Sequence, residues 1–249
     1  METYLRDFGD DLGLFFCRAV DKVVENRRYC IYCPFFGKND KGQCICSVLS
    51  ENDRQFPDFE NSTPELLKAY RFAEMAHRGQ IRKGSNEPYF VHLMEAAGIA
   101  RTLTDEEDII IATLLHDVIE DTGFGFEDLE HEFGTKIAAM VAAVSEDKQR
   151  ERNADESWYD RKTQAVVNLI SQPVEIKTIV LADKLSNIRS TYSEYAASGD
   201  AVFEKFNQKD KDAHAWYYRT IISYIEELSG TDAYRELVDK FNIIFGEDI

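Results

Sequence analysis

Residues 108–121 read DIIIATLLHDVIED, an apolar run that ends in one histidine and three carboxylates. The spacing predicts one buried helix, on which His116, Asp117, Glu120 and Asp121 would fall within an arc of roughly 140°. Burying ionised carboxylates without partners is costly, and a divalent cation offsets that cost. The alternative is a solvated helix end, but negative charge there opposes the helix dipole by about 0.5 kcal/mol per group. The stretch therefore favours a metal site.

The chain on both sides of this stretch has helical spacing from residue 62 onward. Residues 62–65, STPE, predict an N-cap with proline in the first turn, and residues 104–107, TDEE, predict a capping box. Further helical runs are LLKAYRFAEMAHR, VHLMEAAGIARTL, FEDLEHEFGTKIAAMVAAVSED, RKTQAVVNLI, VEIKTIVLADKLSNIRSTYSEYAA, AWYYRTIISYIEELSG and AYRELVDKFNIIF. We find no strand alternation and no internal repeat, so the predicted fold class is all-α.

The first 60 residues differ from the rest and predict a separate extension before a helical domain over residues 61–249. Four cysteines in this extension have a C-x2-C-x10-C-x-C spacing: Cys30, Cys33, Cys44 and Cys46. This spacing is a candidate for a structural zinc site, with buried free thiols or an iron–sulfur or redox role as alternatives. The extension is also a candidate docking or homo-oligomerisation element.

Composition restricts the function class. The 249-residue chain carries 46 acidic against 29 basic residues, a formal net charge of −17. Such a charge argues against binding to nucleic acid or to anionic membranes, although a small polyanion could bind where basic residues cluster. No apolar segment approaches a membrane span, and the acidic N-terminus does not resemble a signal peptide, so we expect a cytoplasmic protein.

Two further residues complete a potential metal site. His92 begins a helix behind EPYFV, and Asp183 lies within the apolar run IVLADKLSNIR. Alone, His92 would be read as a structural histidine and Asp183 as a partner for a lysine. Together with His116 and Asp117 they form a mixed nitrogen and oxygen set suited to manganese, iron or zinc, with positions left for water.

The order H…HD…D resembles the signature of HD-domain phosphohydrolases. Five segments resemble, more narrowly, the hydrolase domain of the RelA/SpoT homologues, and small alarmone hydrolases of the metazoan SpoT-homologue type among them: AHRGQIRKGSNEPYFVH, ATLLHDVIEDT, FEDLEHEFGTKIAAMVAAVSEDK, the RK pair at 161–162, and LADKLSNIR. The resemblance covers about residues 62–225. It implies an HD-domain helical bundle that removes the 3′-pyrophosphate from (p)ppGpp, giving GDP or GTP and pyrophosphate.

The resemblance also implies a role for each matching position. His92, His116, Asp117 and Asp183 would bind one metal ion, Mn²⁺ in most of this family. Glu120 and Asp121 would handle the attacking water.

Four residues would contact the substrate according to the same resemblance: Arg82, Lys83, Lys184 and Asn187. Arg161 and Lys162 could add to the positive rim. Ile81 and Leu93 depart from the family pattern, at a third basic position and at a proline, so the resemblance supports metal binding more strongly than substrate identity.

The chemistry follows from the residues themselves. A bound metal ion lowers the pKa of water towards neutrality and polarises a phosphoryl oxygen, and Glu120 is placed to accept the proton. Only some 60 residues follow Asn187, so we expect hydrolysis without alarmone synthesis. Two alternatives stay open: hydrolysis of another phosphorylated nucleotide, and a non-catalytic alarmone-binding or interaction protein.

Overall fold

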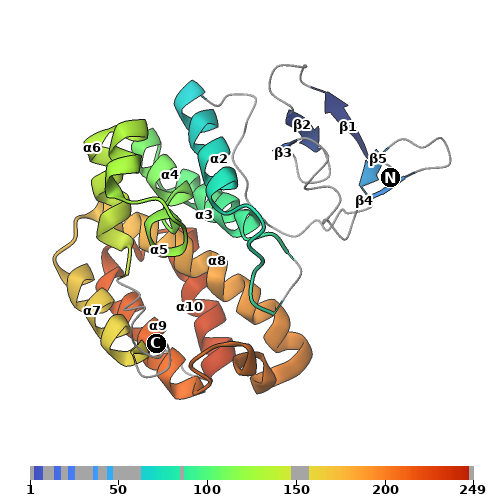
Figure 1. The fold of residues 1–249 in the computed structure, drawn as a ribbon. Helices are drawn as coiled ribbons and strands as arrows, with labels where there is room; N and C mark the ends of the chain where they lie inside the picture. Colours follow the sequence, from blue (N-terminus) through green and yellow to red (C-terminus); the bar gives the residue numbers. More distant parts are fainter. Residues whose placement is uncertain are drawn as a thin grey trace.

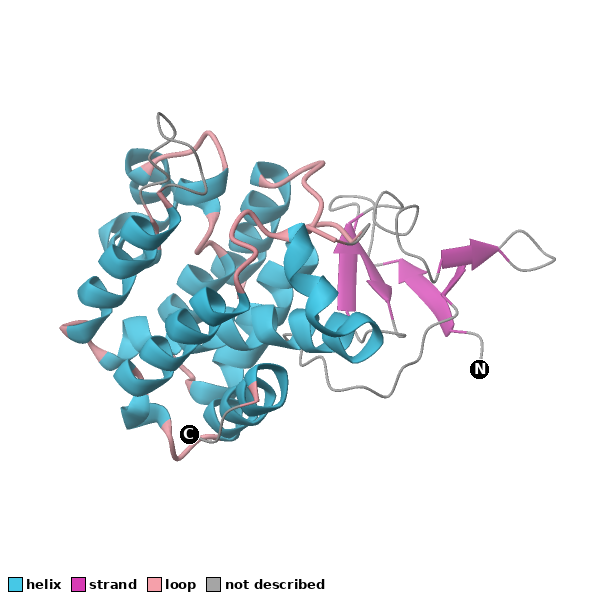
Figure 2. Cartoon of the chain, turned by 90° about the horizontal axis from the view of Figure 1, so that it is seen from below, coloured by secondary structure: helices cyan, strands magenta, loops and turns pink. Residues whose placement is uncertain are grey.

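The computed structural model describes residues 63–84, 87–146 and 157–246, together with the backbone of five short strands between Thr3 and Cys46. Figure 1 shows the order of the elements, and Figure 2 shows that the strands of the described residues lie in the N-terminal part. Among the described residues after 62, all regular elements are helices, which confirms the all-α prediction for the main body.

The main body consists of α2 to α10 and two short 3₁₀ helices. Their bounds are α2 Pro64–Ala76, α3 Phe90–Leu103, α4 Glu107–Leu114, α5 Val118–Asp121, α6 Phe126–Val144, α7 Trp158–Ile170, α8 Val174–Ser198, η2 Gly199–Lys205, α9 Lys211–Tyr224, η3 Glu226–Leu228 and α10 Asp232–Phe245.

The N-terminal strands were not predicted from the sequence. They are β1 Thr3–Asp7, β2 Leu14–Cys17, β3 Lys22–Glu25, β4 Phe36–Lys38 and β5 Cys44–Cys46. They pair antiparallel in the order β3-β2-β1-β5-β4. Strands of three to five residues are too short to show a clear period-2 alternation. Of the predicted zinc ligands, Cys44 and Cys46 belong to β5, while Cys30 and Cys33 lie outside the described residues.

Helix α8 is the central element of the main body. Figure 1 shows it between α3 and α4 on one side and α10 on the other, and α8 contacts all three. Its Ile176 and Ile179 belong to an apolar cluster with α2, α3, α4 and α6. Its Leu181, Leu185 and Ile188 belong to a second cluster with α7, α9 and α10. A helix that is buried on several faces can hold polar side chains in a fixed position between two cores.

Of three sequence predictions about local structure, one is confirmed and two are wrong. The N-cap of α2 is confirmed, since Thr63 Oγ1 accepts from the Leu66 amide at 3.2 Å. The capping box at 104–107 is wrong: α4 begins after Glu106, which makes no side-chain cap, and Thr104 Oγ1 accepts from the Glu106 amide instead.

The single helix predicted over residues 108–121 is also wrong. Helix α4 ends at Leu114 and α5 begins at Val118, so His116 and Asp117 lie in the turn between them. The last turn of α4 tightens because the Leu115 amide donates to the carbonyls of both Ile111 and Ala112. The Val118 amide then donates to the Leu115 carbonyl at 2.9 Å. The helical arc therefore does not explain how these side chains converge.

Candidate metal centre

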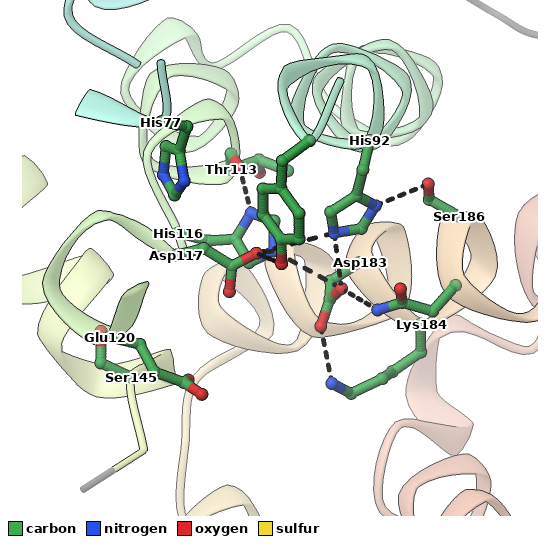
Figure 3. A network of polar contacts seen from close by, with 12 residues as sticks. His77, His92, Thr113, His116, Asp117, Glu120, Ser145, Asp183, Lys184 and Ser186 are labelled. Carbon is green, nitrogen blue, oxygen red and sulfur yellow. Dashed lines mark hydrogen bonds and ion pairs between the residues drawn. The ribbon is translucent and has the colours of Figure 1, made fainter. Parts of the chain in front are cut away.

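Four side chains from three parts of the fold meet at one point. His92 comes from the first turn of α3, His116 and Asp117 from the turn after α4, and Asp183 from the middle of α8. Figure 3 shows both imidazoles directed toward the space beside the two carboxylates. One ligand atom each from His92, His116 and Asp117 lie within 4.8 Å of one another. The structure thus brings together all four residues that the sequence analysis grouped.

The imidazole Nε2 atoms and the carboxylate oxygens at the centre lie within ion-pair distance of one another. His116 Nε2 lies 3.0 Å from Asp117 Oδ2 and 3.4 Å from Asp183 Oδ1. His92 Nε2 lies 3.3 Å from Asp183 Oδ1. Within the part of the chain that the structure describes, neither buried Nε2 has a hydrogen-bond partner. Two imidazole nitrogens that face carboxylates without bonding them fit a shared divalent cation.

The opposite nitrogen of each imidazole is occupied. His92 Nδ1 lies 2.8 Å from Ser186 Oγ, and His116 Nδ1 lies 2.7 Å from the Thr113 carbonyl oxygen. The Thr113 carbonyl can only accept, so His116 carries its proton on Nδ1 and keeps Nε2 for the centre. Such outer partners are typical of histidines that bind metal ions.

A buried polar chain continues behind His92. Ser186 Oγ donates to Glu95 Oε2 at 2.9 Å, so it accepts from His92 Nδ1. Glu95 in turn contacts Arg189 Nη1 at 3.4 Å. Neither Ser186 nor Glu95 was predicted from the sequence. The available signal was their position three residues after Asp183 and His92, which puts each on the same helix face as a ligand.

Tyr89 was also missed. Its hydroxyl donates to Asp117 Oδ2 at 2.6 Å, and its ring stacks on His77 with centroids 5.3 Å apart. His77 Nδ1 meets Gln80 Oε1, and Gln80 Nε2 donates to the Asp121 carbonyl at 2.8 Å. Burial and the neighbouring Asp117 both raise the pKa of the Tyr89 phenol. Tyr89 therefore remains a neutral donor that orients Asp117.

Charge at the centre is balanced by mutual contact. Burial alone would raise the pKa of Asp117, but the His116 imidazole more than offsets this and holds that pKa below its ordinary value. Burial would likewise lower the pKa of His116, but Asp117 and Asp183 raise it. Burial, together with the Arg82 guanidinium, lowers the pKa of His92. A divalent cation at the centre would replace a second proton on His116 Nε2 and neutralise both carboxylates.

A cavity of about 420 Å³ opens from this centre. Its walls include Glu120 and Asp121, the predicted catalytic pair, and also Lys184 and Asn187. Glu120 Oε2 accepts from the Glu146 amide at 3.2 Å. The predicted catalytic residues are thus beside the centre and next to space for a ligand.

The predicted substrate residues divide into two groups. Lys184 Nζ donates to Asp183 Oδ2 at 2.6 Å, and Asn187 donates to the other oxygen of Asp183. Arg82 Nη2 donates to Asn187 Oδ1 at 3.0 Å, which connects its loop to the centre. Lys83 is exposed and donates to Asn207. Neither Arg82 nor Lys83 is among the residues that line the cavity.

Comparison with known proteins identifies a matching family and several relatives. The HD domain family matches residues 69–210. A Drosophila melanogaster relative, the guanosine-3′,5′-bis(diphosphate) 3′-pyrophosphohydrolase MESH1, is 30% identical over 73% of this chain and 93% of its own length. The GTP pyrophosphokinase of Streptomyces coelicolor is 33% identical over 79% of this chain.

The chain spans only 23% of the Streptomyces relative and 18% of the bifunctional (p)ppGpp synthase/hydrolase SpoT of Escherichia coli. Among solved structures, a metazoan orthologue of SpoT that hydrolyses ppGpp is similar with a TM-score of 0.57 and 25% identity, over 74% of this chain and 96% of that one. A Listeria monocytogenes protein is similar with a TM-score of 0.55 and 29% identity, over 68% of this chain and 100% of that one.

Proposed function

Because the chain belongs to the HD-domain family, we propose that it is a metal-dependent hydrolase that removes the 3′-pyrophosphate from ppGpp and pppGpp. The products would be GDP or GTP and pyrophosphate. The MESH1 relative, of which the chain covers 93%, and the SpoT orthologue among the solved structures support this substrate. A substrate of this kind is consistent with action in the cytoplasm.

One observation carries the proposal: two unbonded imidazole nitrogens and two carboxylates converge at the edge of a cavity. We infer that His92, His116, Asp117 and Asp183 bind one divalent cation. The mixed nitrogen and oxygen set suits Mn²⁺. Such an ion, when bound, lowers the pKa of water and polarises a phosphoryl oxygen.

The protein residues would supply the proton transfers and the orientation. Glu120 lines the cavity and accepts a hydrogen bond from the Glu146 amide, which holds its carboxylate beside the centre. We assign it as the general base that takes the proton from the attacking water. Asp121 would orient that water or assist the leaving group.

Substrate binding would use the cations beside the centre. Burial would lower the pKa of Lys184, but contact with Asp183 raises it well above its ordinary value, so the ammonium stays charged at neutral pH. Lys184 could therefore bind a phosphate oxygen, and Asn187 could bind the sugar or its 3′-phosphate. Arg82 and Lys83 would contact the base and the phosphates from the loop before α3.

A second candidate is hydrolysis of another phosphorylated nucleotide by the same centre. It is favoured by the position of Arg82 and Lys83, which do not line the cavity. The loop with Arg82 and Lys83, which would select guanine, is therefore less closely connected to the reaction than the four proposed ligands are.

Product analysis distinguishes these candidates. Purified protein with added Mn²⁺ would be incubated with ppGpp, with pppGpp and with nucleoside 2′- and 3′-phosphates. Pyrophosphate and GDP from ppGpp support the first candidate. Orthophosphate from the other nucleotides, without pyrophosphate from ppGpp, supports the second, and no turnover of any nucleotide rejects both.

A further inference from the structure

A buried ion cluster lies in the wall of the same cavity as the proposed metal centre. It consists of Glu146, which follows α6, and Arg161 and Lys162 near the start of α7. All three line the cavity, as does Tyr217 of α9. None of them belongs to the metal centre.

The cluster has well-defined contacts. Lys162 Nζ lies 2.6 Å from Glu146 Oε1, and Arg161 Nη1 lies 3.2 Å from Glu146 Oε2. The three side chains are only 9% to 18% exposed. Lys162 Nζ also lies 4.8 Å from the centroid of the Tyr217 ring. Each oxygen of one carboxylate is therefore held by a different cation.

Stability alone does not account for this arrangement. Removing three charged groups from water is costly, and a buried ion pair seldom stabilises a fold more than apolar side chains of the same size. The two cations also lie at the N-terminal end of α7, where the helix dipole favours negative charge. Both features favour an anion at this place and disfavour the cations without one.

We propose that Arg161 and Lys162 form a diphosphate subsite and that the Glu146 carboxylate fills this subsite until a diphosphate group displaces it. Arginine and lysine are the side chains that bind phosphate oxygens most strongly, and the two oxygens of Glu146 occupy the places of two phosphate oxygens. The inference rests on the proposed function only in the source of the ligand, which would be the pyrophosphate leaving group or the 5′-diphosphate of the nucleotide.

Glu146 connects the subsite to the proposed base. Its side chain occupies the subsite while its amide donates to Glu120 Oε2 at 3.2 Å. A diphosphate group at the subsite would therefore lie beside Glu120 within the same cavity. The negative charge of Glu146 also repels any phosphate that approaches, so its displacement selects ligands with enough charge to compete.

The test measures binding, not turnover. Inorganic pyrophosphate and GDP would be titrated into the 249-residue chain in EDTA by isothermal calorimetry, so that neither the metal ion nor catalysis contributes. Variants would be Glu146→Gln, which removes the competing charge, and Lys162→Gln and Arg161→Gln, which remove the cations. Glu227→Gln is the matched control, because it breaks a Lys177 ion pair that does not line the cavity.

We expect Glu146→Gln to bind pyrophosphate about tenfold more tightly than the native chain, and Lys162→Gln about tenfold more weakly, as the gain or loss of one charge-assisted contact implies. A change in affinity for pyrophosphate alone identifies the pyrophosphate leaving group as the ligand of the subsite. A change in affinity for GDP alone identifies the 5′-diphosphate of the nucleotide. Equal affinities in the native chain, Glu146→Gln and Lys162→Gln overturn the proposal.

Circular dichroism of each variant checks that it folds. If Glu146→Gln does not fold, pyrophosphate binding by Lys162→Gln and Arg161→Gln still tests the subsite. Failure of the subsite is distinguishable from failure of the proposed function, because ppGpp hydrolysis by the native protein is measured separately.

Discussion

The two histidines of the metal centre are oriented by different means. His116 is fixed locally, by the Thr113 carbonyl three residues earlier. His92 is fixed from another helix, by Ser186 of α8, which is itself held by Glu95. The affinity of the centre for its metal ion should therefore depend on a serine hydroxyl that does not touch the ion.

Replacing Ser186 tests this dependence. Ser186→Ala should weaken metal binding by about 10- to 100-fold, the usual effect of losing an outer partner of a metal-binding histidine. Metal affinity would be measured by competition with a chelator. Ser198→Ala, which removes an exposed hydroxyl of the same helix, is the control and should bind metal normally. Unchanged affinity in Ser186→Ala would refute the positioning role.

Asp183 tests the ligand set itself. Asp183→Ala should weaken metal binding by at least about 100-fold and abolish hydrolysis, because a ligand contributes more than an outer partner does. Helical circular dichroism should persist, because the apolar residues around Asp183 are unchanged. Retained metal in the purified variant would reject the ligand assignment.

Glu120 tests the assignment of the base. Glu120→Gln should keep the metal ion but lower kcat by a factor of about 10² to 10⁴, the range for removal of a general base. The amide is isosteric and can still accept from the Glu146 amide, so the turn should stay in place. A kcat near the native value would show that another group takes the proton.

The residue types of the metal centre were predictable from the sequence, but their outer hydrogen-bond partners were not. His116 and Asp117 stand out because charge follows an apolar run. Ser186 and Glu95 do not, because a serine or a glutamate three residues after a ligand is common in helices, and their burial shows that these two need partners. Burial depends on long-range packing that local spacing does not contain.

At the scale of elements, the break between α4 and α5 shows why helical periodicity alone was insufficient. The run of residues 108–121 has the spacing of one helix, yet Thr113 Oγ1 and His116 Nδ1 both bond carbonyls of the last turns of α4. Side chains that compete for helix carbonyls favour termination. The break directs His116 and Asp117 toward α8, which a continuous helix need not do.

The contact between α8 and α10 gives a pH-dependent prediction. Burial alone would raise the pKa of Glu236, but the hydrogen-bonded Arg189 guanidinium lowers it. Because the folded-state pKa is depressed, the stabilisation is present above the ordinary glutamate pKa of about 4.3 and is lost as the pH falls below it. Glu236→Gln should therefore be less stable than the native chain at pH 7, by about 1 kcal/mol.

This difference should shrink as the pH falls from 5 to 3, as measured by urea unfolding at each pH. Glu204→Gln serves as control, because its pair with Lys209 is exposed and contributes little. A stability difference in Glu236→Gln that does not change with pH would contradict the role assigned to the ion pair.

Across the whole chain, we expect the helical body and the N-terminal extension to be stabilised by different interactions. The body contains two large apolar clusters, and both of them include residues of α8. The described part of the body has no helix that is long and apolar enough to cross a membrane. We propose that residues 61–249 form the catalytic domain and that the extension carries a structural zinc site at Cys30, Cys33, Cys44 and Cys46.

Metal analysis of two proteins tests this division. A chain of residues 63–249 should fold, retain hydrolysis and bind one metal ion, because every proposed ligand and both apolar clusters are present. The full chain should contain zinc in addition, as measured by plasma mass spectrometry. Equal zinc in both proteins would reject the cysteine site, and an unfolded short chain would reject the division.

The overall architecture was predictable from the sequence to the extent that its helices are long and amphipathic. The predicted helical runs RKTQAVVNLI and VEIKTIVLADKLSNIRSTYSEYAA correspond to α7, which ends at Ile170, and to α8, which begins at Val174. The five strands of the extension were missed because each has only three to five residues, and one of their pairings joins residues as distant as Thr3 and Cys46. Pairing over such separations leaves no local signal.

The middle of α8 should be the last part of the molecule to open. Leu181, Ala182 and Ile188 are fully buried around Asp183, and the helix continues for several turns on each side. Backbone amides in such a segment exchange their protons with solvent only through global unfolding. Asp183 thus cannot be lost by fraying of a helix end. Heat should therefore release this ligand only when the domain itself melts, whereas the other three ligands lie at a helix start or in a turn.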